Sequence, residues 1–100
     1  MPKIYEYLGL IFFFYANEHL PIHVHVSKAE RESKIELVFE DGKIKELVAK
    51  KVKGRMELSD TELKDAKKFI KKFYMGIEKK WIEFFVLRTK VKCDVISKKI

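Results

Sequence analysis

The chain has 100 residues, of which 47% are hydrophobic, so residues 1–100 can form one domain with its own core but not two. Its net charge is +7, and its single cysteine, Cys93, excludes an internal disulfide. The apolar run 8–16 is too short to cross a membrane and lacks the leader and cleavage site of a secretory signal. We therefore expect a single cytoplasmic domain without a membrane segment.

The N-terminal half predicts β-strands. Residues 3–8 are a short lead-in that forms either a strand or an extended arm. Residues 10–16 are continuously apolar and partly aromatic, as in a strand that is covered on both faces. Residues 17–21 have the composition of a turn, in which Pro21 disfavours helix for the residue before it. Residues 22–26 alternate apolar residues with histidines, which predicts a half-buried strand.

The clearest hairpin lies at Asp41-Gly42, a pair that suits the positive φ angles of a tight β-turn. Alternating segments at 34–40 and 43–48 flank this pair and are expected to be its two strands. The polar residues 27–33 are expected to form the loop before the hairpin.

Pairing across this turn predicts which side chains face the core. Phe39 is expected opposite Ile44, and Ile35 opposite Val48. In this register Glu46 is a misfit, because it does not follow the apolar alternation.

The C-terminal half predicts helix after a basic connector at 50–57. Ser59 and Glu62 form a capping box at the start of the helix. Gly76 disfavours helix by about 1 kcal/mol relative to alanine, so we expect a kink or break at 74–76. Residues 91–96 form either a short strand or a frayed tail. The apolar stripe at helical spacing is Leu63, Ala66, Phe69, Ile70, Phe73, Ile77, Trp81, Phe84 and Phe85.

These elements predict an α+β fold. A small antiparallel sheet of three or four strands fills the N-terminal half, and one kinked helix or two helices pack across one face of it.

The positive charge is concentrated in the second half: residues 1–49 carry −2 and residues 50–100 carry +9. Such a surface can attract RNA or an acidic partner protein, with candidate contacts at Lys51, Lys53, Lys68 and Lys72. Nineteen of the twenty-two basic residues are lysines, however, which give diffuse charge and not the bidentate fork of arginine. A merely solvated surface is the alternative interpretation.

The three histidines of the protein, His19, His23 and His25, fall within seven residues. His23 and His25 are two apart on a predicted strand, so their side chains share one face, opposite the apolar one. We expect this face to open to solvent or a cleft. His19 comes from the preceding turn and can fold over it, with Asn17 and Glu18 beside it.

Three uses fit this cluster. Two imidazoles can act as general base and general acid on RNA, three can bind zinc or another divalent metal, and all can be purely structural. Glu18 is expected to raise the pKa of a neighbouring imidazole and keep it charged near neutral pH. On that ground His19, His23 and His25 are favoured as catalytic residues, and the metal is a less favoured alternative.

The motif at 17–26, Asn-Glu-His-Leu-Pro-Ile-His-Val-His-Val, together with the opening 1–4 and the segment 80–85, resembles the domain-of-unknown-function family 4160. Many members have Pro-Pro-His where this chain has Pro21-Ile22-His23. These are small bacterial and archaeal proteins without an established activity. The resemblance implies a neighbouring gene for another small protein, in pairs that are commonly taken for toxin–antitoxin systems.

Two functions are therefore expected from the sequence. The first is a ribonuclease-like toxin that uses the histidine cluster and is neutralised by an acidic, antitoxin-like partner. The second is a non-enzymatic module that binds a protein or a metal.

Overall fold

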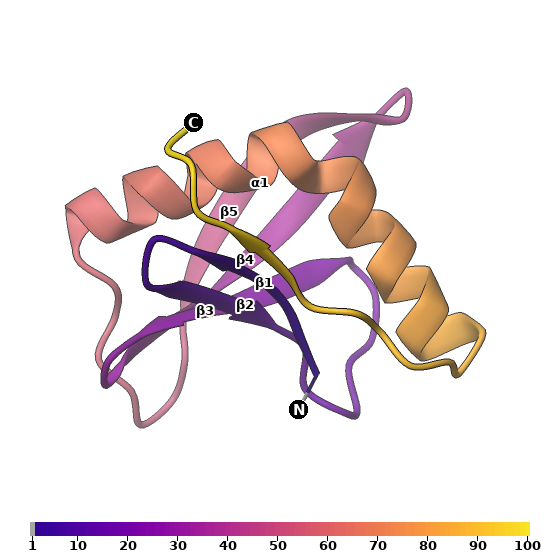
Figure 1. Cartoon of the computed structure of the whole chain (residues 1–100), viewed down its shortest axis with the longest axis horizontal. Coiled ribbons are helices and arrows are strands. Elements are labelled where there is room, and N and C mark those ends of the chain that lie inside the picture. Colours follow the sequence, from indigo (N-terminus) through magenta and orange to yellow (C-terminus); the bar gives the residue numbers. More distant parts are fainter. Residues whose placement is uncertain (1) are drawn as a thin grey trace.

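The computed structural model describes residues 2–100, so Met1, the first residue of the motif at 1–4, lies outside it. Six strands form one sheet in the order β5-β4-β3-β2-β1-β6, in which only β1 and β6 are parallel. One long helix, α1, lies across one face of this sheet (Figure 1). The strands are β1 (Lys3–Tyr7), β2 (Leu10–Phe13), β3 (His23–Lys28), β4 (Arg31–Glu40), β5 (Lys43–Lys51) and β6 (Asp94–Ile96). Helix α1 spans Asp60–Trp81 and continues into a π-helical turn, η1 (Ile82–Val86).

The predicted α+β class is confirmed, with a single bent helix, but the expected number of three or four strands is wrong. The lead-in forms β1 and the C-terminal tail contains β6. Most of the predicted loop 27–33 is strand as well. No helix within residues 2–100 is long and apolar enough to cross a membrane.

Strand β6 depends on tertiary contacts, because three residues carry little strand preference of their own. After η1 the chain returns past the sheet and pairs beside β1 (Figure 1). The buried Lys80 of α1 donates hydrogen bonds to the backbone oxygen of Lys92 and, at 2.9 Å, to the carboxylate of Asp94. The ammonium of Lys80 also lies 4.9 Å from the centre of the Tyr5 ring. These contacts attach the end of the chain to the helix.

Tight turns join the antiparallel strands. Asp41 and Gly42 have φ angles of 53° and 78°, so the predicted hairpin turn is confirmed. The β1–β2 turn also has two positive φ angles, at Leu8 and Gly9. Between β3 and β4 only two residues intervene, and Ala29 there has a φ of 55°. Because this turn contains no Gly, Asn or Asp, its composition did not identify it.

The register of the predicted hairpin is partly confirmed. Phe39 pairs with Ile44 as expected. The expected pairing of Ile35 with Val48 is wrong, since Ile35 lies opposite Ala49. A β-bulge in β5, between these two pairs, shifts the register by one residue.

The bulge also explains the misfit of Glu46. Val38 pairs with Glu46 and the next residue, Phe39, pairs with Ile44, so Lys45 is the extra residue. Glu46 is consequently exposed, while Leu47 packs against the core. A single inserted residue thus keeps Ile44, Leu47 and Ala49 of β5 packed against the core.

Helix α1 begins with the predicted capping box. The backbone nitrogen of Ser59 donates to Glu62 at 2.8 Å, and the backbone nitrogen of Glu62 donates to Ser59 Oγ at 3.2 Å. The expected stripe faces the sheet, where fully burying each large side chain contributes roughly 1.5–3 kcal/mol. Phe69 lies at the centre of the core, with its ring 4.7 Å from that of Phe12 and 5.0 Å from that of Tyr7. The buried residues of the stripe are Ala66, Phe69, Ile70, Ile77 and Trp81.

The helix bends close to the predicted position. The non-helical residue is Phe73 (φ −110°, ψ 18°), one residue before the expected range 74–76. Gly76 lies within the helix and serves a different purpose. A Cβ atom at Gly76 would overlap the hydroxyl of Tyr5, so glycine lets β1 and α1 approach each other.

Replacing Gly76 with alanine should therefore destabilise the protein, although alanine ordinarily stabilises a helix by about 1 kcal/mol. We expect Gly76→Ala to lower the free energy of unfolding by about 1–3 kcal/mol, the usual range for overpacking. In the Tyr5→Phe background the hydroxyl is gone and the loss should largely disappear. Urea unfolding of the four proteins measures this double-mutant cycle. A stabilising Gly76→Ala in the Tyr5 protein would contradict the close contact.

The start of α1 is attached to β4 by an ion pair with pH-dependent strength. Arg31 donates from Nε to Glu62 Oε1 at 2.9 Å and from Nη2 to Oε2 at 2.6 Å. These bonds from Arg31, together with the backbone of Ser59, lower the pKa of Glu62 to about 2 from its ordinary 4.5. A lowered carboxyl pKa stabilises the folded state above the ordinary pKa, and that stability is lost as the pH falls through the lowered one.

We expect Glu62→Gln to lower the thermal unfolding midpoint by a few degrees at pH 7. The difference from the unaltered protein should shrink as the pH falls from about 4.5 towards about 2, because Glu62 then becomes neutral too. Thermal unfolding followed by circular dichroism across this pH range measures it. Glu57→Gln, at an exposed position before the helix, is the control and should show no such convergence.

Candidate functional site

Strand β3 divides its side chains between the two faces of the sheet, as predicted. Val24 and Val26 point towards α1 and are completely buried. His23 and His25 point to the opposite face, for which we expected an opening to solvent or a cleft; direct exposure of the imidazoles to solvent is wrong. Their exposed fractions are 4% and 5%, so both imidazoles are as buried as core residues.

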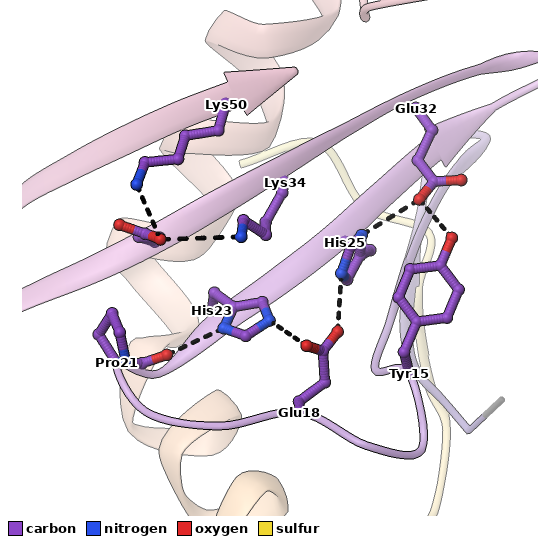
Figure 2. Close-up of polar contacts among 9 residues, drawn as sticks. Tyr15, Glu18, Pro21, His23, His25, Glu32, Lys34 and Lys50 are labelled. Carbon is purple, nitrogen blue, oxygen red and sulfur yellow. Dashed lines mark hydrogen bonds and ion pairs between the residues drawn. The ribbon is translucent and has the colours of Figure 1, made fainter. Parts of the chain in front are cut away.

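The segment between β2 and β3 covers the imidazoles. In Figure 2 it runs below β3, where Tyr15, Glu18 and Pro21 lie beside the two histidine rings. The Tyr15 ring lies 4.2 Å from that of His25. On the other side of the pair, Trp81 of α1 lies 5.3 Å from the ring of His23. Aromatic rings thus exclude water from both imidazoles.

The carboxylate of Glu18 lies between the two histidines (Figure 2). Its Oε2 is 2.8 Å from Nε2 of His23, and its Oε1 is 2.8 Å from Nε2 of His25. One donor atom from each of these three residues can be chosen so that all lie within 4.8 Å of one another. The sequence places Glu18 near the histidines, and the fold brings it into direct contact with both.

The outer nitrogen of each imidazole is also occupied. Nδ1 of His23 is 2.9 Å from the backbone oxygen of Pro21, and because a carbonyl only accepts, this nitrogen carries the proton. Nδ1 of His25 is 3.1 Å from Oε2 of Glu32, which also accepts a 2.7 Å hydrogen bond from the Tyr15 hydroxyl. Both rings therefore direct Nε2 inward, towards Glu18.

The protonation of His25 follows from its burial. Burial lowers the pKa of His25 below its ordinary 6.5, although the carboxylates of Glu18 and Glu32 act in the opposite direction. The expectation that Glu18 keeps this imidazole charged is therefore wrong for His25. A neutral His25 has one N–H for two carboxylates, so one of its two ring nitrogens faces a carboxylate oxygen with its lone pair.

Burial acts on Glu18 as well. It raises the pKa of Glu18, but the contacts with His23 and His25 outweigh it and leave the pKa below its ordinary value. Glu18 is thus a carboxylate at neutral pH. Nε2 of His23 lies within 2.8 Å of it but off the direction of a hydrogen bond, and it is a buried nitrogen without a hydrogen-bond partner among residues 2–100.

The other residues predicted for the site lie away from this cluster. His19 and Asn17 are exposed in the loop, and His19 is not part of the converging group. The lysines predicted to contact RNA or an acidic partner are also exposed, two near the end of β5 and two on α1. They are Lys51, Lys53, Lys68 and Lys72.

Three contributors were not predicted. Glu32 was assigned to a loop, although it continues the alternation of β4 and points to the same face as His25. Tyr15 follows β2 in the chain, and the alternation of the sequence does not indicate that its hydroxyl reaches Glu32. Arg55, whose Nη1 lies 3.5 Å from Glu32, comes from the connector before α1 and has no sequence pattern that indicates this contact.

Comparison with known proteins bears on identity but not on chemistry. The model of the family described as Domain of unknown function (DUF4160) matches residues 9–82. The chain belongs to this family. The resemblance seen in the sequence is thereby confirmed, and the match includes the whole histidine motif. No curated protein and no solved structure matches the chain.

Proposed function

We propose that this DUF4160 protein is a metal-binding module, in which Glu18, His23 and His25 hold one divalent transition-metal ion. One observation carries the proposal: two buried imidazoles present Nε2 to the same carboxylate while their Nδ1 atoms are bonded elsewhere. A cation between them would satisfy all three groups at once. Without it, Nε2 of His23 is a buried nitrogen with no hydrogen-bond partner among residues 2–100, which is unfavourable.

The distances fit such an ion. Donor atoms at about 2.0–2.1 Å from a metal are separated from each other by roughly 2.9 Å in octahedral and roughly 3.4 Å in tetrahedral geometry. The separations of 2.8 Å between the imidazole nitrogens and the carboxylate oxygens are close to this range. One donor atom from each of the three residues lies within 4.8 Å of the other two.

The surroundings of the histidines also match those of metal ligands. A ligating histidine usually donates its other ring N–H to a carboxylate or a backbone carbonyl, which fixes the ring and its tautomer. His25 has the carboxylate of Glu32 in this position, and His23 has the carbonyl of Pro21. Tyr15 and Arg55 in turn hold Glu32.

Two histidines and one carboxylate suit zinc and iron(II). With three protein ligands, a bound ion keeps a position for water and can act there as a Lewis acid. The chain itself contributes the orientation of both rings, and Trp81 and Tyr15 shield the cluster from solvent. Since Glu18 comes from the loop and the histidines from β3, the ion would also attach the loop to the sheet.

The test is zinc binding by the metal-free protein, measured by calorimetry and by thermal unfolding. We expect one zinc per chain and a stabilisation of about 2.7 kcal/mol at a free concentration of about 100 times Kd. Cobalt(II) should give visible absorption bands, because its spectrum reports the coordination geometry. Glu18→Gln and His25→Gln should each weaken binding by at least about tenfold.

His19→Gln is the matched control, because it removes an exposed imidazole from the same loop. It should leave zinc affinity unchanged. Absence of saturable binding, or an equal loss in His19→Gln, would overturn the proposal.

The ribonuclease-like toxin stays a prediction, and the geometry supports it less. His23 and His25 are buried, and Glu18 occupies the space between them in which a phosphate would have to sit. The exposed lysines favour contact with RNA or an acidic antitoxin-like partner, but they do not bring a catalytic group to that surface. A cytoplasmic location likewise stays a prediction.

Expression in cells separates the two functions. A metal-binding module should not arrest growth, whereas a ribonuclease should arrest growth and lose this effect in His23→Ala and His25→Ala. Cell density and total RNA integrity after induction are the measurements. If the His23→Ala and His25→Ala variants fold, as shown by circular dichroism, and still cleave RNA, then the histidines are not catalytic.

A further inference from the structure

A hollow of about 180 Å³ lies beside the cluster of Glu18, His23 and His25. Its lining residues are Lys3, Ile11, Phe13, Ser27, Glu32 and Arg55. We propose that this hollow binds a small carboxylate with an apolar body, and that Arg55 and Lys3 contact the carboxylate. The proposal does not rest on a bound metal, since neither His23 nor Glu18 lines the hollow.

The sheet provides the floor of the hollow on the face opposite α1. Ile11 lies opposite Ser27 in the β2–β3 pair, and Ser27 lies opposite Glu32 in the β3–β4 pair. Phe13 stacks on His25, with ring centres 5.6 Å apart. The floor thus has two apolar side chains and one hydroxyl, which suits a ligand that is apolar at one end.

The charges around the hollow favour an anion. Among the lining residues, Lys3 and Arg55 contribute two positive charges and Glu32 contributes one negative charge. Outside the lining, the exposed carboxylate of Glu6 lies 4.0 Å from Nζ of Lys3, and an ion pair this exposed is weak. The negative charge of Glu32 is already engaged: its Oε2 accepts from the Tyr15 hydroxyl and lies 3.1 Å from Nδ1 of His25, and its Oε1 lies 3.5 Å from Arg55. An entering anion therefore meets an excess of positive charge.

Arg55 is the best-placed contact. Its Nη2 donates to the backbone oxygen of Glu30 at 3.1 Å, which positions the guanidinium, while 41% of the side chain is exposed. A guanidinium has five N–H donors, and these contacts leave several available. The Ser27 hydroxyl can donate a further hydrogen bond to the ligand.

The size and floor of the hollow distinguish among anions. A nucleic acid strand is too large to enter a space of this volume, and a free phosphate gains nothing from Ile11 and Phe13. A cationic or neutral ligand of the same shape would lose the attraction of the two positive charges. A carboxylate attached to a small apolar group uses every part of the lining.

Benzoate is the probe, and amide chemical shifts of the isotope-labelled protein are the measurement. We expect saturable shifts at Phe13, Ser27 and Arg55 with benzoate, in both metal-free and zinc-loaded protein. Benzyl alcohol and benzylamine, which have the same ring, should give no saturable shifts there. Equal responses to all three probes, or benzoate shifts only elsewhere in the protein, would overturn the proposal.

Charge variants test the contacts. Arg55→Gln and Lys3→Gln should each weaken benzoate binding by about tenfold, the usual effect of losing one charge-assisted contact. Lys45→Gln makes the same charge change on β5, away from the hollow, and should have no effect. If Arg55→Gln fails to fold, the exposed Lys3→Gln decides the matter. The proposal would also be overturned if every variant that folds binds benzoate as tightly as the unaltered protein.

Discussion

The contact of Glu18 with two buried imidazoles is the interaction on which this side of the molecule depends. Burying a polar ring costs free energy unless its nitrogens have partners, and water cannot reach either ring. The loop between β2 and β3 supplies the Pro21 carbonyl, which accepts from Nδ1 of His23, and the Glu18 carboxylate, which lies 2.8 Å from both Nε2 atoms. The loop can therefore close over the sheet only in a position that brings its polar atoms to the histidines.

The two faces of β3 have opposite chemistry, and α1 contacts both. Phe69 and the other buried residues of the helix pack on the apolar face around Phe12. Beyond the bend at Phe73, the ring of Trp81 packs against Phe14 of the core and also against His23. The helix thus stabilises the core and also shields the histidine pair, so the direction of its second half affects both.

Glu32 connects the two features of the histidine face. It holds His25 and Tyr15 on one side and borders the hollow with Arg55 on the other. Glu32 is buried and has three partners, and removal of any one of them would leave part of its charge uncompensated. The proposed metal centre and the proposed carboxylate site would accordingly share one wall.

Membership of the family identifies the chain but does not indicate what reaction or binding it carries out. The DUF4160 match covers both the loop and β3, and therefore the residues on which the functional proposals rest. A fold of this kind does not by itself imply an activity. The arrangement of Glu18, His23 and His25 is the physical basis of the metal-binding function proposed above.

The sequence by itself determined the local features. Alternation placed His23 and His25 opposite Val24, and composition identified the Asp41-Gly42 turn and the capping box of Ser59, because each depends on neighbouring residues only. Only the tertiary structure decided that β6 is a strand, that a bulge turns Glu46 outward, and that Glu32 and Arg55 reach the site. It also decided that the imidazoles are buried, which reverses the expected pKa direction of His25. Burial is the sum of contacts from distant segments, here the loop and the far end of α1, and no pattern within β3 contains that information.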